Sequence, residues 1–100
     1  MHQFRYRQGI LHCEEVSLQA LVEEHGTPLY VYSAQTFRDN YQQLHTALKG
    51  LDHRIAYAVK ANSNLSVLGL LAELGSGFDI VSGGELFRVI KAGGDPKLCS

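Results

Sequence analysis

The chain has 100 residues, of which 45% are hydrophobic and 19% are charged, and its formal net charge is −1. This composition is that of an ordinary globular protein, and so small a net charge gives no reason to expect nucleic acid or a membrane surface as a partner. No apolar run approaches the roughly 20 residues of a membrane-spanning helix, and the N-terminus lacks the apolar core of a secretion signal, so we expect a cytoplasmic protein.

The first third of the chain predicts a hairpin, a short helix and a strand. Residues 4–13 alternate loosely around a Gln-Gly pair, which is a weak hairpin signal. Ser17 is a suitable N-cap for a short helix that Gly26 ends. Thr27-Pro28 breaks that helix, and Leu29–Tyr32 is rich in residues that favour β structure, so a strand is predicted there.

The rest of the chain alternates between helices and strands. The predicted order is a helix at 34–49 capped by Ser33, a strand at 55–59, a helix at 65–74, a strand at 78–82, a helix at 83–92 and the start of a strand at 97–99. This alternation with short glycine-bearing links predicts an α/β fold with a parallel sheet. Because the last strand has barely begun, we expect the N-terminal part of a longer protein, and these 100 residues alone are predicted to fold poorly.

The cysteines and histidines lack the spacing of a metal site. Cys13 and Cys99 lie far apart, and neither belongs to a CxxC motif, so two free thiols are expected. The five histidines are interpreted as solvated surface residues; they are His2, His12, His25, His45 and His53. We therefore predict no bound metal.

Polar residues follow two of the predicted strands. Lys60 ends a strand that looks buried on both faces, Asp79 lies early in the next strand, and Glu85 follows that strand's end. In parallel α/β folds the chemistry sits at the carboxyl ends of the strands. Burial opposes the charge of a lysine and makes its amine nucleophilic, which suits imine formation with a carbonyl compound.

Each of these residues also has a structural interpretation. A lysine after a strand is often a solvated loop residue. Asp79 fits a turn or cap, and Ser82 with Glu85 fits the start of a helix. The glycine-rich segments are weak phosphate signals, because neither matches GxGxxG or a P-loop.

Three segments resemble conserved motifs of the group IV pyridoxal-phosphate decarboxylases. They are YAVKAN at 57–62, GSGFDIVSGGEL at 75–86 and GTPLYVY at 26–32. The residues at 61–64 and 82–85 are most similar to those of the diaminopimelate decarboxylase branch. The resemblance implies a (β/α)8 TIM-like barrel of the alanine racemase type with a second, mainly β domain. Residues 1–33 would contribute to the β domain, and residues 34–100 would start the barrel.

The resemblance also implies a site and a reaction. Lys60 is expected to be the catalytic residue that holds pyridoxal 5′-phosphate, and Asp79 to lie near the cofactor, whereas Glu85 is a weaker candidate. The implied reaction is decarboxylation of meso-2,6-diaminopimelate to L-lysine and CO2, the last step of lysine biosynthesis, by a homodimer. The alternatives are another basic amino-acid decarboxylase, an amino-acid racemase, or a non-catalytic relative that binds the cofactor.

Overall fold

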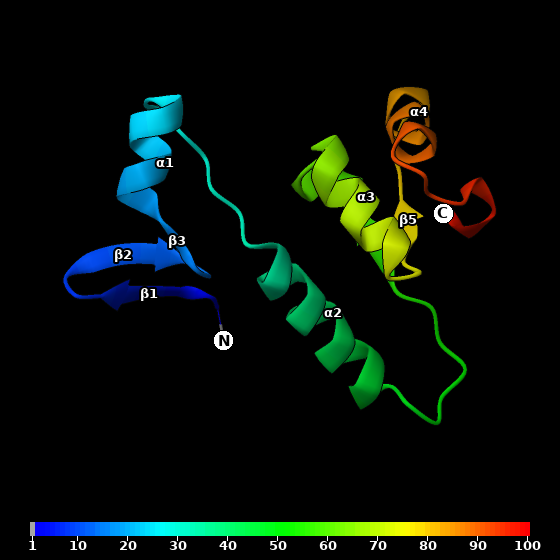
Figure 1. The fold of residues 1–100 in the computed structure, drawn as a ribbon. Helices are drawn as coiled ribbons and strands as arrows, with labels where there is room; N and C mark the ends of the chain where they lie inside the picture. The colour runs from blue at the N-terminus through cyan, green and yellow to red at the C-terminus, as the bar shows by residue number, and fades with distance from the viewer. Residues whose placement is uncertain (1) are drawn as a thin grey trace. The chain divides into compact units, whose positions relative to one another are not determined.

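The computed structural model describes residues 2–100, which form two compact units. The first unit ends at Asp39, and the second runs from Asn40 to Ser100. Helix α2 (Ala34–Ala47) begins in the first unit and ends in the second. Figure 1 shows the order of the elements along the chain.

The first unit is built on a three-stranded antiparallel sheet. Its order is β1 (Phe4–Arg7), β2 (Ile10–Cys13) and β3 (Val16–Ser17), and α1 (Leu18–His25) follows directly. The two-residue turn between β1 and β2 has positive φ at both positions, 52° and 80°, which matches the twist of a tight hairpin. The predicted hairpin is therefore confirmed.

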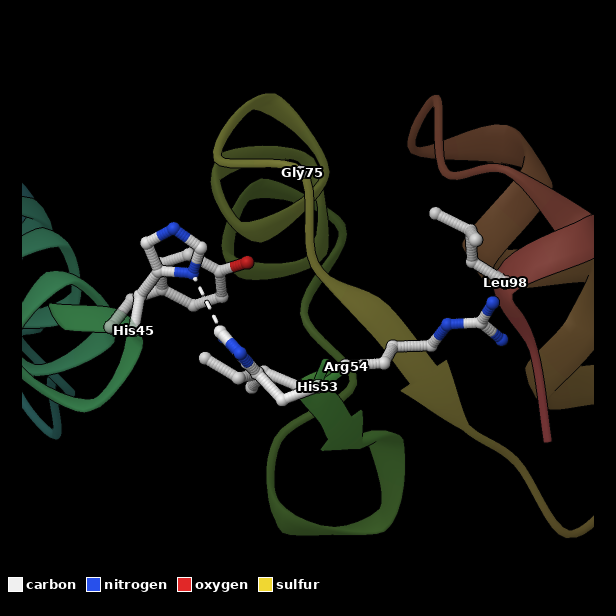
Figure 2. A pocket seen from close by; sticks show the side chains of 7 residues that line it. His45, His53, Arg54, Gly75 and Leu98 are labelled. Carbon is white, nitrogen blue, oxygen red and sulfur yellow. Dashed lines mark hydrogen bonds between the residues drawn. The ribbon is translucent and has the colours of Figure 1, made fainter. Parts of the chain in front are cut away.

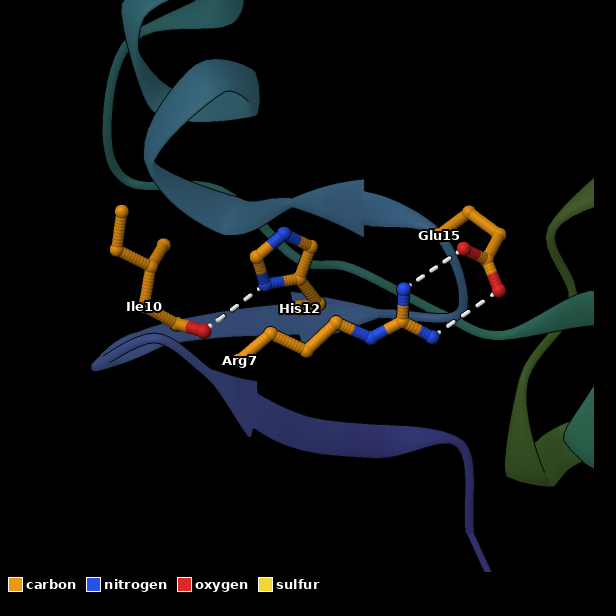
Figure 3. A network of polar contacts seen from close by, with 4 residues as sticks. All are labelled: Arg7, Ile10, His12 and Glu15. Carbon is orange, nitrogen blue, oxygen red and sulfur yellow. Dashed lines mark hydrogen bonds and ion pairs between the residues drawn. The ribbon is translucent and has the colours of Figure 1, made fainter.

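A bidentate ion pair lies on the surface of this sheet. Arg7 of β1 donates two hydrogen bonds of 2.7 and 3.0 Å to the carboxylate of Glu15, as Figure 3 shows. This contact raises the pKa of Arg7 and lowers the pKa of Glu15. Because both side chains are exposed, solvent screens the pair, and it adds little to stability.

Both predicted ends of α1 are confirmed, but the strand predicted after this helix does not form. The Ser17 hydroxyl accepts a hydrogen bond of 3.2 Å from the Ala20 amide, and Gly26 ends α1 at φ 78°. The strand predicted at Leu29–Tyr32 is wrong, because this segment pairs with no other strand of residues 2–100. β-propensity reflects packing on a half-buried sheet, whereas the side chain of Tyr30 is 85% exposed.

Two side chains cap the start of α2. The Ser33 hydroxyl accepts a hydrogen bond of 3.1 Å from the Thr36 amide, which confirms the predicted cap. The same hydroxyl donates to the Glu14 carboxylate at 2.7 Å, and that carboxylate also accepts from the Gln35 amide at 3.2 Å. These contacts satisfy amides that a helix start leaves without partners. They also lower the pKa of Glu14, the Ser33 contact most.

The second unit contains the parallel sheet that the sequence predicted. Strands β4 (Ala56–Ala58) and β5 (Gly77–Asp79) pair in parallel, and each is shorter than expected. Cys99 forms a parallel bridge to Phe78 on the other side of β5, directly after a short 3₁₀ helix, η2 (Pro96–Leu98). The strand start predicted at 97–99 is therefore wrong for its first two residues, which lie in η2, and only Cys99 pairs with β5.

Helices α3 (Leu65–Glu73) and α4 (Gly83–Lys91) contact each other and complete the two βα units. The apolar residues buried in this unit come from both helices, from β5 and from the residue that follows β4; they are Val59, Val67, Leu68, Leu71, Phe78 and Val89. The α/β architecture is thus confirmed. None of the helices within residues 2–100 has the length and apolarity needed to cross a membrane.

Candidate functional site

The carboxyl edge of the parallel sheet brings two predicted residues together. Ala58 of β4 is in register with Asp79 of β5, and Lys60 follows two positions later in a short 3₁₀ helix, η1 (Val59–Ala61). Asp79 is the last residue of its strand rather than an early one, which corrects the expected position. Lys60 and Asp79 therefore leave the sheet at the same edge, where the chemistry of parallel folds is placed.

The amine of Lys60 is exposed, contrary to the expectation of a buried lysine. The neighbouring residue Val59 is fully buried in the core, whereas Lys60 is exposed. Within residues 2–100, the side chains of Lys60 and Asp79 make no hydrogen bond or ion pair. The described residues therefore do not remove the amine from water.

The segment after Lys60 is held by side chains from distant positions. The Tyr57 hydroxyl donates to the carbonyl oxygen of Asn62 at 2.9 Å, and Nε of Arg88 donates to the carbonyl oxygen of Ser63 at 2.9 Å. Asn64 then starts α3, since its side-chain oxygen accepts from a helix amide at 2.8 Å. The sequence analysis missed the contact of Arg88 with Ser63, because it spans 25 positions.

Glu85 is engaged in starting α4. The Ser82 hydroxyl accepts a hydrogen bond of 3.1 Å from the Glu85 amide, and the Glu85 carboxylate accepts one of 2.8 Å from the Val81 amide. This reciprocal arrangement is a variant of the capping box. It supports the structural interpretation of Glu85 over a role at the cofactor.

A pocket of about 230 Å³ lies at the opposite, amino edge of the same sheet. Figure 2 shows His45 and His53 pointing toward each other, with His45 Nδ1 3.2 Å from His53 Nε2, while the side chain of Arg54 runs toward Leu98. His45 is exposed, as expected of a surface histidine, whereas His53 is half-buried. Because active sites of α/β barrels lie at the carboxyl edge, the pocket is not the candidate catalytic site. No cluster of three or more His, Cys, Asp or Glu side chains suited to a metal ion occurs in residues 2–100.

Comparison with known proteins identifies the family. Residues 34–99 match the family model described as pyridoxal-dependent decarboxylase, pyridoxal binding domain. The chain belongs to this family. It is 55% identical over 94 residues to a diaminopimelate decarboxylase from Pseudomonas fluorescens, a match that covers 94% of this chain and 23% of that protein. The chain therefore spans about a quarter of the length of such relatives.

Solved structures of family members have the same fold over nearly the whole chain. A diaminopimelate decarboxylase from M. jannaschii superposes with a TM-score of 0.91 at 36% identity, covering 97% of this chain and 24% of that one. A lysine decarboxylase from Selenomonas ruminantium superposes with a TM-score of 0.79 at 32% identity, covering 99% and 24%. These matches place residues 34–99 in the N-terminal part of the barrel domain.

The residues at the carboxyl edge fit pyridoxal phosphate in part. Lys60 offers a primary amine without a partner in residues 2–100, and Asp79 offers a carboxylate at the same edge. Gly83 leaves open space beside the backbone, since a Cβ added there would meet no atom within 4 Å. This donor set suits a covalently held aldehyde cofactor whose nitrogen is protonated.

Proposed function

We propose that this protein is a pyridoxal-phosphate-dependent decarboxylase that converts meso-2,6-diaminopimelate to L-lysine and CO2. The observation that carries the proposal is the shared sheet edge of Lys60 and Asp79, in a chain whose relatives from several bacteria are diaminopimelate decarboxylases. The reaction belongs to the whole protein, of which this chain supplies the first two βα units of the barrel.

In this proposal the two residues have separate roles. Lys60 would hold the cofactor through its amine. Asp79 would place a negative charge at the same sheet edge, which favours a protonated nitrogen there. Bound pyridoxal phosphate supplies the electron sink for the electron pair left by loss of the substrate carboxylate.

The test is the substitution Lys60→Ala in the full-length protein, with Lys49→Ala as the matched control. Lys49 is also exposed and lies directly after α2, within the same unit. We expect Lys60→Ala to lose both the imine absorbance and lysine formation, while the control keeps both. Borohydride should trap the cofactor on the peptide that contains residues 57–62. A Lys60→Ala protein that retains the absorbance and forms lysine would reject the assignment.

A second candidate function is decarboxylation of another basic amino acid. It is favoured by the structural similarity to the lysine decarboxylase from Selenomonas ruminantium. Release of CO2 from a panel containing diaminopimelate, lysine, ornithine and arginine separates the two decarboxylases. A racemase would invert a substrate without releasing CO2, and a non-catalytic relative would bind the cofactor and do neither.

Three further expectations belong to the same proposal. Residues 1–33 contribute to the β domain and residues 34–100 start the barrel, the active protein is a homodimer, and it works in the cytoplasm. The antiparallel sheet at β1–β3 supports the domain assignment, because it differs in kind from the parallel sheet that follows. The mass of the full-length protein by light scattering tests the homodimer.

A further inference from the structure

We propose that Arg88 and Tyr57 are positioning residues that fix the segment after Lys60 and so aim its amine toward the cofactor. The inference rests on the proposed function, because it assumes that Lys60 holds pyridoxal phosphate. It concerns residues that do not touch the reacting atoms themselves. Both act on the backbone, at two consecutive carbonyl groups two and three positions after Lys60.

The backbone that carries Lys60 has little support of its own. Helix η1 is a single 3₁₀ turn of three residues, and no side chain caps its start at Ala58. At its end the Asn62 amide donates to the carbonyl oxygen of Val59 at a long 3.2 Å. Single 3₁₀ turns have poorer hydrogen-bond geometry than α-helices. The direction of the Lys60 side chain therefore depends on what holds the two ends of this turn.

The start of the turn is anchored by burial. Val59 is fully buried in the core, which fixes the residue directly before Lys60. The end of the turn is anchored by polar contacts instead. The Tyr57 hydroxyl donates to the carbonyl oxygen of Asn62 at 2.9 Å, and the next carbonyl, that of Ser63, accepts from Nε of Arg88 at 2.9 Å. Lys60 thus lies between one buried side chain and two hydrogen-bonded carbonyl groups.

The two donors are themselves held in place. The ring of Tyr57 packs edge-to-face on Phe78, with the ring centres 6.5 Å apart, and Phe78 is fully buried. Arg88 lies in α4 directly before the fully buried Val89, and the contacts of Glu85 one turn earlier fix the start of that helix. Rigid donors at defined positions are what orientation of a catalytic group requires.

Through Arg88, α4 connects the two halves of the site. The helix begins four residues after Asp79, at the carboxyl end of β5, and its second turn reaches the segment that follows Lys60. A shift of α4 would therefore move the Lys60 segment relative to the Asp79 segment. Arg88, although exposed on the helix surface, therefore links α4 to the segment that follows Lys60.

The experiment measures imine formation in the full-length protein after its cofactor has been removed. Pyridoxal phosphate is added, and the rate of appearance of the imine absorbance is followed for Arg88→Met, Tyr57→Phe and Arg88→Lys. Arg88→Met removes the charged donor, and a tenfold slower rate is expected, roughly the effect of losing one charge-assisted hydrogen bond. Arg88→Lys retains a donor and should recover part of the rate. Lys91→Met, an exposed cation one turn later in α4, is the matched control.

A second readout separates positioning from general stability. Hydrogen exchange of the peptide at residues 61–65 should accelerate in Arg88→Met and Tyr57→Phe but not in Lys91→Met. If both variants form the imine as fast as Lys91→Met, the inference is overturned, even where their thermal midpoints fall. Tyr57→Phe and Arg88→Lys decide the question if Arg88→Met fails to fold. Absence of borohydride labelling at Lys60 in the unsubstituted protein would instead overturn the proposed function.

Discussion

Asp79 in β5 pairs in parallel register with Ala58 in β4, which lies two residues before Lys60. This register predicts an effect of Asp79→Asn on the bound cofactor. A nearby carboxylate favours the protonated imine, so its removal should move the pH transition of the imine absorbance to lower pH. We expect a displacement of roughly one pH unit, the size of a single nearby charge effect. A spectroscopic pH titration of the full-length protein measures it.

Asp52→Asn is the matched control for this substitution. Asp52 is exposed in the loop before β4, and it makes no hydrogen bond or ion pair with any residue from 2 to 100. The control should leave the transition unchanged. Equal transitions in Asp79→Asn and Asp52→Asn would show that the Asp79 carboxylate does not act on the cofactor.

A second prediction concerns the dependence of stability on pH through Glu14. The hydrogen bonds from Ser33 and Gln35 lower the pKa of the Glu14 carboxyl in the folded protein. The unfolded chain therefore binds a proton at higher pH than the folded chain, and stability rises with pH across this range. The stabilisation is present above the ordinary pKa of glutamate and disappears as the pH falls through the lowered value. Glu14→Gln should cost about 1 kcal/mol of unfolding free energy at pH 7.

Urea unfolding of the full-length protein at pH 7 and at about pH 3 tests this prediction. The difference between the unsubstituted protein and Glu14→Gln should be present at pH 7 and shrink at the lower pH. Glu73→Gln serves as the control, because Glu73 is exposed at the end of α3 and its side chain makes no hydrogen bond or ion pair within residues 2–100. A difference that is the same at both pH values would contradict the linkage.

The helix starts could be predicted because their causes are local. Ser17, Ser33 and Ser82 each accept a hydrogen bond from an amide three positions later, and Asn64 from one two positions later. Patterns of this length can be read directly from a sequence. The failed strand at Leu29–Tyr32 shows the opposite case, because a strand needs a partner that local composition does not specify.

In the candidate site, too, local features could be predicted from the sequence, whereas contacts between distant segments could not. The position of Lys60 just after a strand followed from the sequence pattern, but Asp79 was expected early in its strand and lies at its end. The exposure of Lys60 did not follow from the pattern, because burial depends on residues far along the chain. Arg88 was missed for the same reason, since its contact with Ser63 depends on how α4 packs against the chain before α3. The histidine pair at the amino edge likewise joins a helix to a loop. Contacts between elements are set by packing rather than by periodicity.

The last prediction concerns Gly77, the first residue of β5, which lies close to the backbone of Ile55 before β4 and of Leu98 in η2. A Cβ at this position would lie 2.7 Å from the carbonyl oxygen of Leu98 and 3.2 Å from that of Ile55. Both obstacles are backbone atoms, and the Gly77 amide also donates to Ile55 at 2.8 Å, so the strands would have to separate to admit a methyl group. Gly77→Ala should therefore destabilise the full-length protein by about 1–3 kcal/mol, the range for overpacking a core.

Gly83→Ala is the control for Gly77→Ala, because a Cβ at Gly83 would meet no atom within 4 Å. Gly83 is the first residue of α4, and alanine is the better helix former, so this substitution should leave the thermal midpoint unchanged or raise it slightly. Gly77→Ala should lower the midpoint by several degrees and also slow imine formation, because Gly77 lies in the strand that carries Asp79. If the two variants melt together, the backbone beside Gly77 has room for a methyl group, and the close approach of Leu98 and Ile55 would have to be different.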